Sequence, residues 1–232
     1  MIELGRVSSL VVISPHADDE VVGAGGIMAK AAAAGVDVHV VLMAVDALKH
    51  WGLDAETTLA GRMTEIEAVA SRLGFSYEIV YAGKDLIERL DTVGQRELID
   101  VLESTFNRLR PDLLLIPHGD DFDQDHRACY EAALAAARPI PEAVGKFLVP
   151  NVITYEAPKL SWAGATFRPS FFVDISEQID DKLDALRLYA TQLREPPHVR
   201  SPENLRALAY LRGSDIGVEF AEAFGVLRAS GA

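Results

Sequence analysis

Along the first half of this chain, continuous hydrophobic runs alternate with segments in which hydrophobic residues recur at the spacing of a helix. The runs cover residues 10–13, 36–43 and 113–116 and are rich in Val, Leu and Ile. Such runs are typical of strands that are buried on both faces of a sheet. Helical patterns cover residues 25–34, 56–73 and 95–109. The alternation predicts an α/β fold with a mostly parallel sheet and helices on both faces.

The second half of the chain continues the alternation less regularly. A helix is expected from residue 126 to about residue 138, followed by a loop that contains several prolines. Strand candidates then cover residues 152–155 and 171–175, and helix candidates cover residues 177–192, 202–211 and 218–228. A chain of 232 residues can bury one sizeable core. We therefore expect a single domain over residues 1–232.

Chemically active side chains follow the first apolar run directly. His16, Asp18 and Asp19 lie in a short segment after residue 13, with Glu20 next to them. In a tight turn after a strand, His16 and Asp19 can face one cation, while Asp18 faces a water molecule beside it. In an open α/β sheet, ligand sites form at the carboxyl ends of the strands, where this segment is expected.

A second acidic segment follows the apolar run 113–116 and ends at His126. Two imidazoles and one carboxylate, from His16, Asp19 and His126, would leave a coordination position open, as in catalytic zinc sites. The alternative is that the acidic residues only form turns or cap the next helix. We favour the metal site because both His-containing acidic segments follow predicted buried strands.

Composition limits the partners that the chain can have. The 22 Lys and Arg residues against 35 Asp and Glu residues give a formal charge of -13. This charge disfavours nucleic acid and anionic membrane surfaces. The single cysteine, Cys129, cannot form an internal disulfide, and the N-terminus lacks the pattern of a signal peptide. No apolar stretch approaches the roughly 20 residues of a membrane span. We therefore expect a cytoplasmic protein.

Two further features allow alternatives. Gly23, Gly25 and Gly26 superficially suggest a phosphate loop, but their spacing differs from the dinucleotide motif, so they are interpreted as positions of close packing. Arg62 and Glu65 lie one helical turn apart and could form an ordinary surface ion pair.

Several motifs together resemble the LmbE-like, or PIG-L-like, family of metal-dependent N-deacetylases. Pro15-His16-Ala17-Asp18-Asp19-Glu20 is similar to the P-H-x-D-D-E motif of that family, with Ala17 where proline is common. Arg62-x-x-Glu65 resembles its next block, and Asp125-His126 matches its D-H pair. Similarity to the bacterial branch continues through residues 198–224, so the resemblance covers nearly the whole chain.

The resemblance implies a Rossmann-like α/β fold and hydrolysis of an N-acetyl or short N-acyl group from an amino sugar. It implies Zn²⁺ held by His16, Asp19 and His126, with Fe²⁺ or Co²⁺ as alternatives. Asp18 is implied as the general base for a water molecule on the metal. Asp125 is expected to orient a ligand ring, because metal-binding histidines need such a partner.

One position departs from the family pattern and affects the expected acid. Many members have a histidine three residues before the last metal ligand, and this chain has Asp123 there. The missing function could come from Asp18 acting twice, from a protonated Asp123, or from an imidazole of His118 or His198. We expect Asp123 to be ionised and to point away from the oxyanion, and His118 or His198 to take the role of the missing imidazole. Arg62, Asp123 and His198 are expected at the substrate. His198 is also the candidate for completing the site of a neighbouring subunit in a homo-oligomer, a trimer or hexamer.

Two other functions fit the same motifs. One is an amidase that cleaves a glucosamine-containing thiol conjugate, which product analysis would separate from an N-deacetylase. The other is a metal-dependent sugar-binding protein without activity, which the retained Asp18 disfavours, because binding alone needs no base beside an open coordination site.

Overall fold

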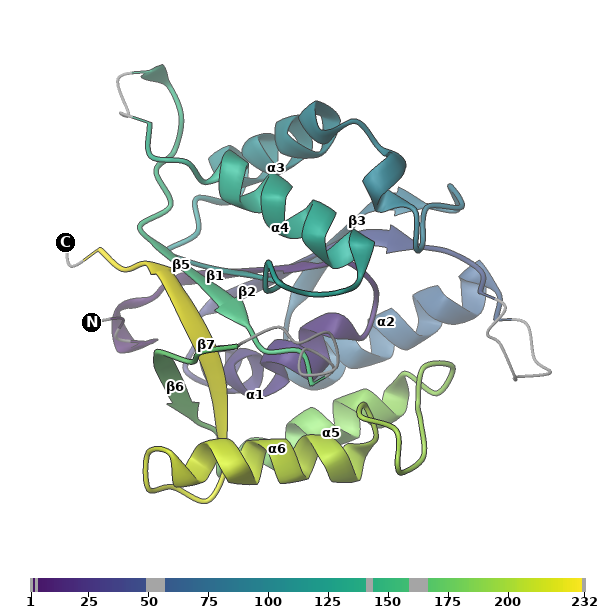
Figure 1. Ribbon diagram of the computed structural model, residues 1–232, viewed down its shortest axis with the longest axis vertical. Helices are drawn as coiled ribbons and strands as arrows, with labels where there is room; N and C mark the ends of the chain where they lie inside the picture. The colour runs from purple at the N-terminus through teal and green to yellow at the C-terminus, as the bar shows by residue number, and fades with distance from the viewer. Residues whose placement is uncertain (1, 3, 49–56, 141–143, 159–166, 231–232) are drawn as a thin grey trace.

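A seven-stranded sheet forms the centre of the protein, as the computed structural model shows for residues 2, 4–48, 57–140, 144–158 and 167–230. The strand order is β3-β2-β1-β4-β5-β7-β6 (Figure 1). The first five strands in this order are parallel, and β7 pairs antiparallel with both β5 and β6. The strands are β1 (Ser9–Ser14), β2 (Asp37–Val45), β3 (Ser76–Ala82), β4 (Leu113–Ile116), β5 (Asn151–Tyr155), β6 (Phe171–Asp174) and β7 (Ala221–Arg228).

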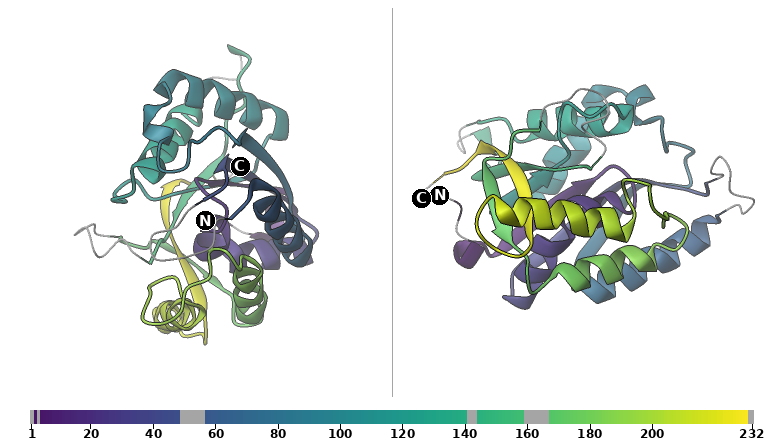
Figure 2. Two further views of the ribbon diagram at one scale, coloured as in Figure 1. Left: turned by 90° about the vertical axis from the view of Figure 1, so that its right-hand side faces the viewer. Right: turned by 60° about the horizontal axis from the view of Figure 1, so that its bottom comes forward.

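Helices cover both faces of the sheet, as the alternating pattern predicts (Figures 1 and 2). One face carries α3 and α4, and the other carries α1, α2, α5 and α6. The α-helices are α1 (Asp19–Ala33), α2 (Leu59–Leu73), α3 (Gln95–Leu109), α4 (Gln124–Ala136), α5 (Ile179–Leu188) and α6 (Pro202–Ser214); the short 3₁₀ helices are η1 (Leu4–Arg6) and η2 (Leu90–Thr92). In the part of the chain that the structure describes, no helix is long and apolar enough to cross a bilayer.

The two cores follow from the side-chain alternation along the central strands. Leu10 and Val12 of β1 face the core under α1, whereas Val11 and Ile13 face the core under α3 and α4. All four side chains are fully buried. A strand that is buried on both faces has no polar position to expose, which is why β1 reads as a continuous apolar run.

Two elements differ from the sequence-based expectation. Strand β3 is not predicted by a continuous run, because it lies at an edge of the sheet and its side chains are only partly buried. The helix predicted over residues 218–228 is wrong, because residues 221–228 form β7, which pairs with strands on both sides. Gly225 of β7 lies against Thr154 of β5, where an added Cβ would come within 2.7 Å of Oγ1.

A buried ion pair holds β7 to the helical layer. The Glu222 carboxylate accepts hydrogen bonds from the backbone N–H groups of Gly26 and Ile27, each at 2.8 Å. It also accepts one from Lys182 Nζ at 2.6 Å. Because each charge has partners, this pair can be buried without an isolated ion. Tertiary pairing of this kind overrides the local helical preference of residues 218–228.

The glycines of α1 are positions of close packing, as expected. A Cβ at Gly23 would lie 2.2 Å from the ring of Tyr155, and one at Gly26 would lie 2.7 Å from Ile175 Cγ2. The side chains of Tyr155 and Ile175 therefore use the space that the glycines leave. Gly25 is similarly close to Lys182.

We predict that Gly26→Ala lowers the free energy of unfolding by about 1–3 kcal/mol, the usual cost of overpacking a core. Ile175 cannot move away easily, because its Cβ lies 2.9 Å from the added atom and its side chain is fully buried. Urea unfolding measures the change. Gly5→Ala is the matched control, because nothing lies within 4 Å of its added Cβ. Equal stability of both variants would contradict the packing argument.

The order of the strands creates a topological switch point between β1 and β4, at the carboxyl ends of these strands. From β1 the chain moves to β2 and β3 on one side, and it later returns to β4 on the other side of β1. Neighbouring loops after β1 and β4 therefore lead to opposite faces and leave a crevice between them. The two acidic segments found in the sequence lie in these two loops and in the first turns of α1 and α4 that follow them.

Candidate metal centre

The turn after β1 is fixed by the side chains of Ser14 and Glu20. Ser14 Oγ donates to the His16 carbonyl at 2.6 Å, and the Glu20 N–H donates to Ser14 Oγ at 3.1 Å. Asp18 has φ 137°, a backbone region that residues other than glycine rarely adopt. Such strain is held only when surrounding contacts fix it. The turn thus brings His16 and Asp19 to the same side.

His16, Asp19 and His126 form a compact group that could hold a metal ion. One ligand atom from each of the three lies within 4.8 Å of the others. Asp19 Oδ2 is 3.4 Å from His16 Nδ1 and 3.1 Å from His126 Nε2. Asp19 and His126 are buried, and His16 is half-buried. The structure therefore brings together the three residues predicted as ligands.

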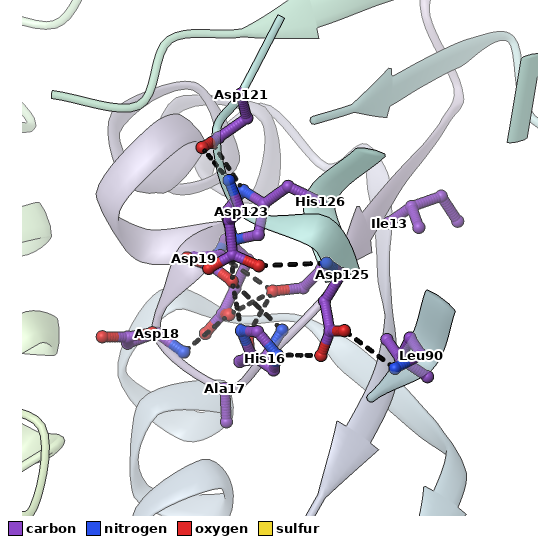
Figure 3. A network of polar contacts seen from close by, with 12 residues as sticks. Ile13, His16, Ala17, Asp18, Asp19, Leu90, Asp121, Asp123, Asp125 and His126 are labelled. Carbon is purple, nitrogen blue, oxygen red and sulfur yellow. Dashed lines mark hydrogen bonds and ion pairs between the residues drawn. The ribbon is translucent and has the colours of Figure 1, made fainter. Parts of the chain in front are cut away.

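Each histidine has a carboxylate at its other ring nitrogen (Figure 3). His16 Nε2 lies 2.8 Å from Asp125 Oδ2, and His126 Nδ1 lies 2.9 Å from Asp121 Oδ2. Asp125 is itself held by the backbone N–H of Leu90 at 2.8 Å. Carboxylates in these positions fix the ring orientation and leave the opposite nitrogen available as a ligand. Asp125 therefore contacts the ring of a candidate ligand, as expected. That ligand is His16 and not the adjacent His126.

The acidic surroundings favour positive charge at the centre of the group. Burial lowers the pKa of His16, but hydrogen bonds to Asp125 and Asp19 outweigh it and raise that pKa to about 10. Burial would raise the pKa of Asp19, but the charge of His126 and its hydrogen bond hold that pKa well below the ordinary value. A site that stabilises a proton so strongly also favours a cation.

These residues fit a divalent transition metal. The donor set is two imidazole nitrogens and one carboxylate oxygen, which are the ligands that zinc takes in catalytic sites. The carboxylates of Asp121 and Asp125 supply the outer partners that such ligands need.

Asp18 is buried next to the group without belonging to it. Only 2% of its surface is exposed, and its Oδ2 accepts a hydrogen bond from Arg200 Nη1 at 2.8 Å. Burial raises the pKa of Asp18, although the charge of Arg200 opposes the rise. A carboxylate in this environment can take up a proton more readily than one in water.

Glu20 also stabilises the turn after β1. Its carboxylate accepts hydrogen bonds from Tyr189 Oη at 2.6 Å, Ser14 Oγ at 2.9 Å and the Asp18 N–H at 3.2 Å. Burial raises the pKa of Glu20 to about 7, although the hydrogen bond from Tyr189 opposes the rise. Glu20 therefore positions the Asp18 backbone.

A cavity of about 330 Å³ opens beside two of the three candidate ligands, His16 and Asp19. This volume is in the range of small-molecule sites. Its wall combines the acidic group with two arginines and several apolar side chains. The lining residues are His16, Asp18, Asp19, Leu48, Arg62, Ile87, Glu88, Phe122, Asp123, Gln192, His198, Val199 and Arg200.

Arg62 lines the cavity and also ties three parts of the fold together. Its Nη1 donates to Glu65 Oε2 at 3.0 Å and to Thr191 Oγ1 at 2.9 Å, and its Nη2 donates to the Ala17 carbonyl at 2.7 Å. Arg62 is 1% exposed, so it is not a surface ion pair. These contacts position the turn that carries Asp18. Direct contact of Arg62 with substrate stays a prediction.

The two histidines predicted as acids lie in different places. His198 lines the cavity of its own chain, and its Nδ1 accepts a hydrogen bond from the backbone N–H of Arg200 at 3.1 Å. His118 is not among the described residues that line this cavity; its ring packs edge-on against Phe167, and its Nδ1 lies 3.3 Å from Thr154 Oγ1. The catalytic roles of both, and completion of a neighbour's site by His198, stay predictions.

Asp123 lies at the cavity wall and caps α4. Its Oδ1 accepts a hydrogen bond from the Asp125 N–H at 3.0 Å. This is the capping role that an acidic residue before a helix often has. The cap and the cavity position are compatible, since one carboxylate oxygen is sufficient for the cap.

We predict that Asp123→Asn keeps most of the activity and the stability, because asparagine caps a helix about as well as aspartate. Asp123→Ala should lower the free energy of unfolding by about 1 kcal/mol, the usual cost of losing a cap. Thermal unfolding and kcat of the two variants, measured in parallel, check this. A nearly inactive Asp123→Asn would instead make the Asp123 carboxyl the acid.

Asp121 and Arg200 are site residues that sequence reasoning misses. Asp121 is one of several acidic residues in a loop, and nothing in its spacing distinguishes it from Asp120, which is exposed. Arg200 lies 182 residues from Asp18 in the sequence, so only the fold brings them together. The one available signal is a basic residue close to His198 in the proline-containing segment 194–202.

Solved structures of other proteins share the fold of this chain. The conserved protein TT1542 from Thermus thermophilus is 24% identical, with a TM-score of 0.73 over 96% of each chain. The 4-carboxy-2-hydroxymuconate hydratase GalB from Pseudomonas putida is 23% identical, with a TM-score of 0.77 over 97% of this chain and 98% of that chain. N,N'-diacetylchitobiose deacetylase from Pyrococcus horikoshii is 22% identical, with a TM-score of 0.70 over 96% of this chain and 84% of that chain. At this level of identity the likeness shows the fold.

The family profile described as PIG-L, GlcNAc-PI de-N-acetylase, matches residues 11–137. The match spans more than half of the 232 residues and includes both loops of the candidate metal centre. The expected Rossmann-like sheet, with the site at the carboxyl ends of β1 and β4, is also present. The chain therefore belongs to the PIG-L (LmbE-like) family.

Proposed function

We propose that this protein is a metal-dependent N-deacetylase that removes an acetyl or short acyl group from the nitrogen of an amino sugar. The observation that carries the proposal is the buried Asp18 beside the His16, Asp19 and His126 group, at the wall of one cavity. Membership of the PIG-L family supports the same reaction. A protein that only binds sugar needs no such carboxylate.

The proposed ligands are His16, Asp19 and His126, and zinc is the metal that best suits two imidazoles and one carboxylate. Such an ion supplies Lewis acidity, which polarises the amide carbonyl and lowers the pKa of water to about 7. Iron(II) and cobalt(II) bind similar ligands, so the metal in the cell depends on availability.

Residues of the chain supply proton transfer, orientation of the ligand rings and support of the turn that carries Asp18. Asp18 takes the proton of the attacking water and then delivers it to the departing amine, so that the amine leaves as a neutral group. Asp121 and Asp125 keep the two ligand rings in place. Arg62 and Glu20 hold the turn from which Asp18 projects. This arrangement uses one residue as base and acid in succession.

The cavity wall also indicates which amino sugars suit the site. Leu48, Ile87, Phe122 and Val199 line it from four separate loops, and Phe122 and Val199 are 40% and 42% exposed. A free monosaccharide carries mostly hydroxyl groups, whereas an apolar substituent would cover these side chains. Burial of apolar surface is worth roughly 25 cal/mol per Å².

We predict that kcat/KM for an aryl glycoside of N-acetylglucosamine exceeds that for the free sugar by about tenfold, which corresponds to about 1.4 kcal/mol of apolar contact. Phe122→Ser should remove this preference and leave the free sugar nearly unaffected. Exposed Tyr210 on α6 offers the control Tyr210→Ser, which should change neither value. A preference that survives in Phe122→Ser would contradict this role of the cavity wall.

Acetate release from a panel of N-acetylated amino sugars and glycoconjugates tests the proposed reaction. A glucosamine-containing thiol conjugate should be tested in parallel by product analysis, because its cleavage would identify the alternative amidase. Hydration of an unsaturated tricarboxylic acid, followed by its ultraviolet absorbance, should also be measured, since GalB, with the same fold, is named as a hydratase. Acetate from none of the amides, with full metal occupancy, would remove the deacetylase proposal.

A further inference from the structure

Arg200 brings a guanidinium group to the carboxylate that we propose as the base. It lies in the segment between α5 and α6, and its Nη1 is 2.8 Å from Asp18 Oδ2. Its side chain is 23% exposed and lines the cavity. The carboxylate of Asp18 raises the pKa of Arg200 despite burial, and the charges of Asp19 and Asp123 contribute. Arg200 is therefore a permanent cation within an acidic wall.

Arg200 differs from Arg62 in how many of its donors are used. Arg62 directs both of its terminal nitrogens at protein acceptors and has a 2% exposed side chain. Among the described residues, Asp18 is the one hydrogen-bond acceptor of the Arg200 side chain. Neither Nε nor Nη2 of Arg200 is among the buried side-chain atoms that lack a partner, and Arg200 lines the cavity. An arginine has five N–H donors in a rigid fork, and most of these remain available to a ligand in the cavity.

The histidines are less suited than Arg200 to hold a negative oxygen. His118 does not line the cavity within the described part of the chain. His198 accepts a hydrogen bond at Nδ1 from the backbone of Arg200. Burial, followed by the charges of Arg200 and Arg194, lowers the pKa of His198, which keeps the ring neutral near pH 7. A guanidinium, by contrast, stays charged throughout the reaction.

We infer that Arg200 donates a hydrogen bond to the oxyanion of the tetrahedral intermediate, in the role that a histidine at position 123 would otherwise have. The inference rests on the proposed deacetylase function. A group that takes the proton of the attacking water must lie near the carbonyl carbon, and Arg200 is hydrogen-bonded to that group. Its free N–H donors are therefore within reach of the carbonyl oxygen.

The step balances without any proton from Arg200. Water oxygen bonds to the carbonyl carbon, its proton moves to Asp18, and the electron pair of the C=O double bond moves to oxygen. On collapse, that pair re-forms C=O, the C–N bond breaks, and its electrons go to nitrogen, which takes the proton from Asp18. Arg200 only stabilises the charge between these steps. Removal of one such donor typically costs about 10²- to 10³-fold in kcat.

The first test separates transition-state stabilisation from substrate binding. Arg200→Ala, reconstituted with zinc, should lose about 10²-fold in kcat with KM nearly unchanged. It should also bind a methylphosphonamidate of glucosamine, whose tetrahedral phosphorus carries the negative oxygen, about 10²-fold more weakly by calorimetry. Arg194→Ala is the matched control, because Arg194 is in the same segment but donates to the carbonyls of Leu193 and Thr191. It should behave like the wild type.

The second test asks whether Arg200 acts only by holding Asp18. If so, Arg200→Ala should cost nothing in analogue affinity once Asp18→Ala is present, because the two changes would remove one interaction. We expect the loss of about 10²-fold to persist in the double variant. Added guanidinium ion should also restore part of the kcat of Arg200→Ala, and urea at the same concentration should not.

The outcomes distinguish this inference from the proposed function. If the wild type releases no acetate and does not bind the analogue, the deacetylase proposal fails and the inference fails with it. If the wild type does both but Arg200→Ala binds the analogue normally, only the inference fails. A loss that vanishes in the Asp18→Ala background also overturns it and makes Arg200 a positioning residue.

Discussion

Asp18→Asn should lower kcat by at least about 10²-fold while the protein keeps its fold and its metal. General acid–base catalysis typically contributes about 10²- to 10⁴-fold, and in the proposed reaction one carboxylate serves in both proton transfers. Asparagine has nearly the same shape and can still accept the hydrogen bond from Arg200, but it cannot take up a proton. Asp18 is not one of the three clustered ligands, so metal binding should be preserved.

Steady-state kinetics together with elemental analysis of the same samples measure this prediction. The matched control is Asp120→Asn, because Asp120 is an exposed aspartate of the β4–α4 loop whose side chain is 72% exposed. It removes the same charge from the surface and should leave kcat within about twofold, as surface substitutions usually do. Near-normal turnover of Asp18→Asn with full metal content would remove Asp18 from the reaction.

His16→Ala or His126→Ala should remove most of the bound metal and with it nearly all of the activity. Each variant deletes one of only three protein ligands, and two ligands seldom hold a catalytic zinc ion at neutral pH. A smaller loss of metal affinity is expected for the two carboxylates that contact the ligand rings. Asp121→Asn and Asp125→Asn should weaken metal affinity by about 10- to 100-fold, because each carboxylate fixes the ring of one ligand.

Metal competition with a chromophoric chelator measures these affinities directly. His39→Gln is the control, since His39 lies on β2 with Nδ1 at 2.8 Å from Ser76 Oγ and is outside the site. Circular dichroism establishes that each variant is folded. Full zinc occupancy in both His16→Ala and His126→Ala would show that zinc binds at another site.

The central part of the fold could be predicted because its strands are buried on both faces. Helix α3 and strand β4 have the bounds that the apolar pattern indicates. The pattern is weaker where burial is partial. Edge strand β3 has no continuous apolar run, and residues 218–228 have helical spacing although residues 221–228 form β7. Only pairing with β5 and β6, together with the ion pair of Glu222 and Lys182, determines that strand.

The ligands of the candidate site could be predicted for a similar reason. His16 and Asp19 follow β1, His126 follows β4, and parallel neighbouring strands bring their carboxyl ends together. Asp121 and Arg200 could not be predicted from the local sequence, because their function depends on contacts that the local sequence does not encode. Asp121 contacts a ring on the following helix, and Arg200 reaches Asp18 from the far end of the chain.

The most direct test of the proposed function is acetate release from an N-acetylglucosamine glycoside by the wild-type protein before and after removal of metal. The protein is stripped with a chelator, assayed, and assayed again after one equivalent of zinc is added. We predict acetate and free amine in equal amounts from the loaded protein, loss of activity on stripping, and recovery with zinc. Unchanged acetate release from fully stripped protein, or none from the loaded protein across the whole panel, would contradict a metal-dependent deacetylase.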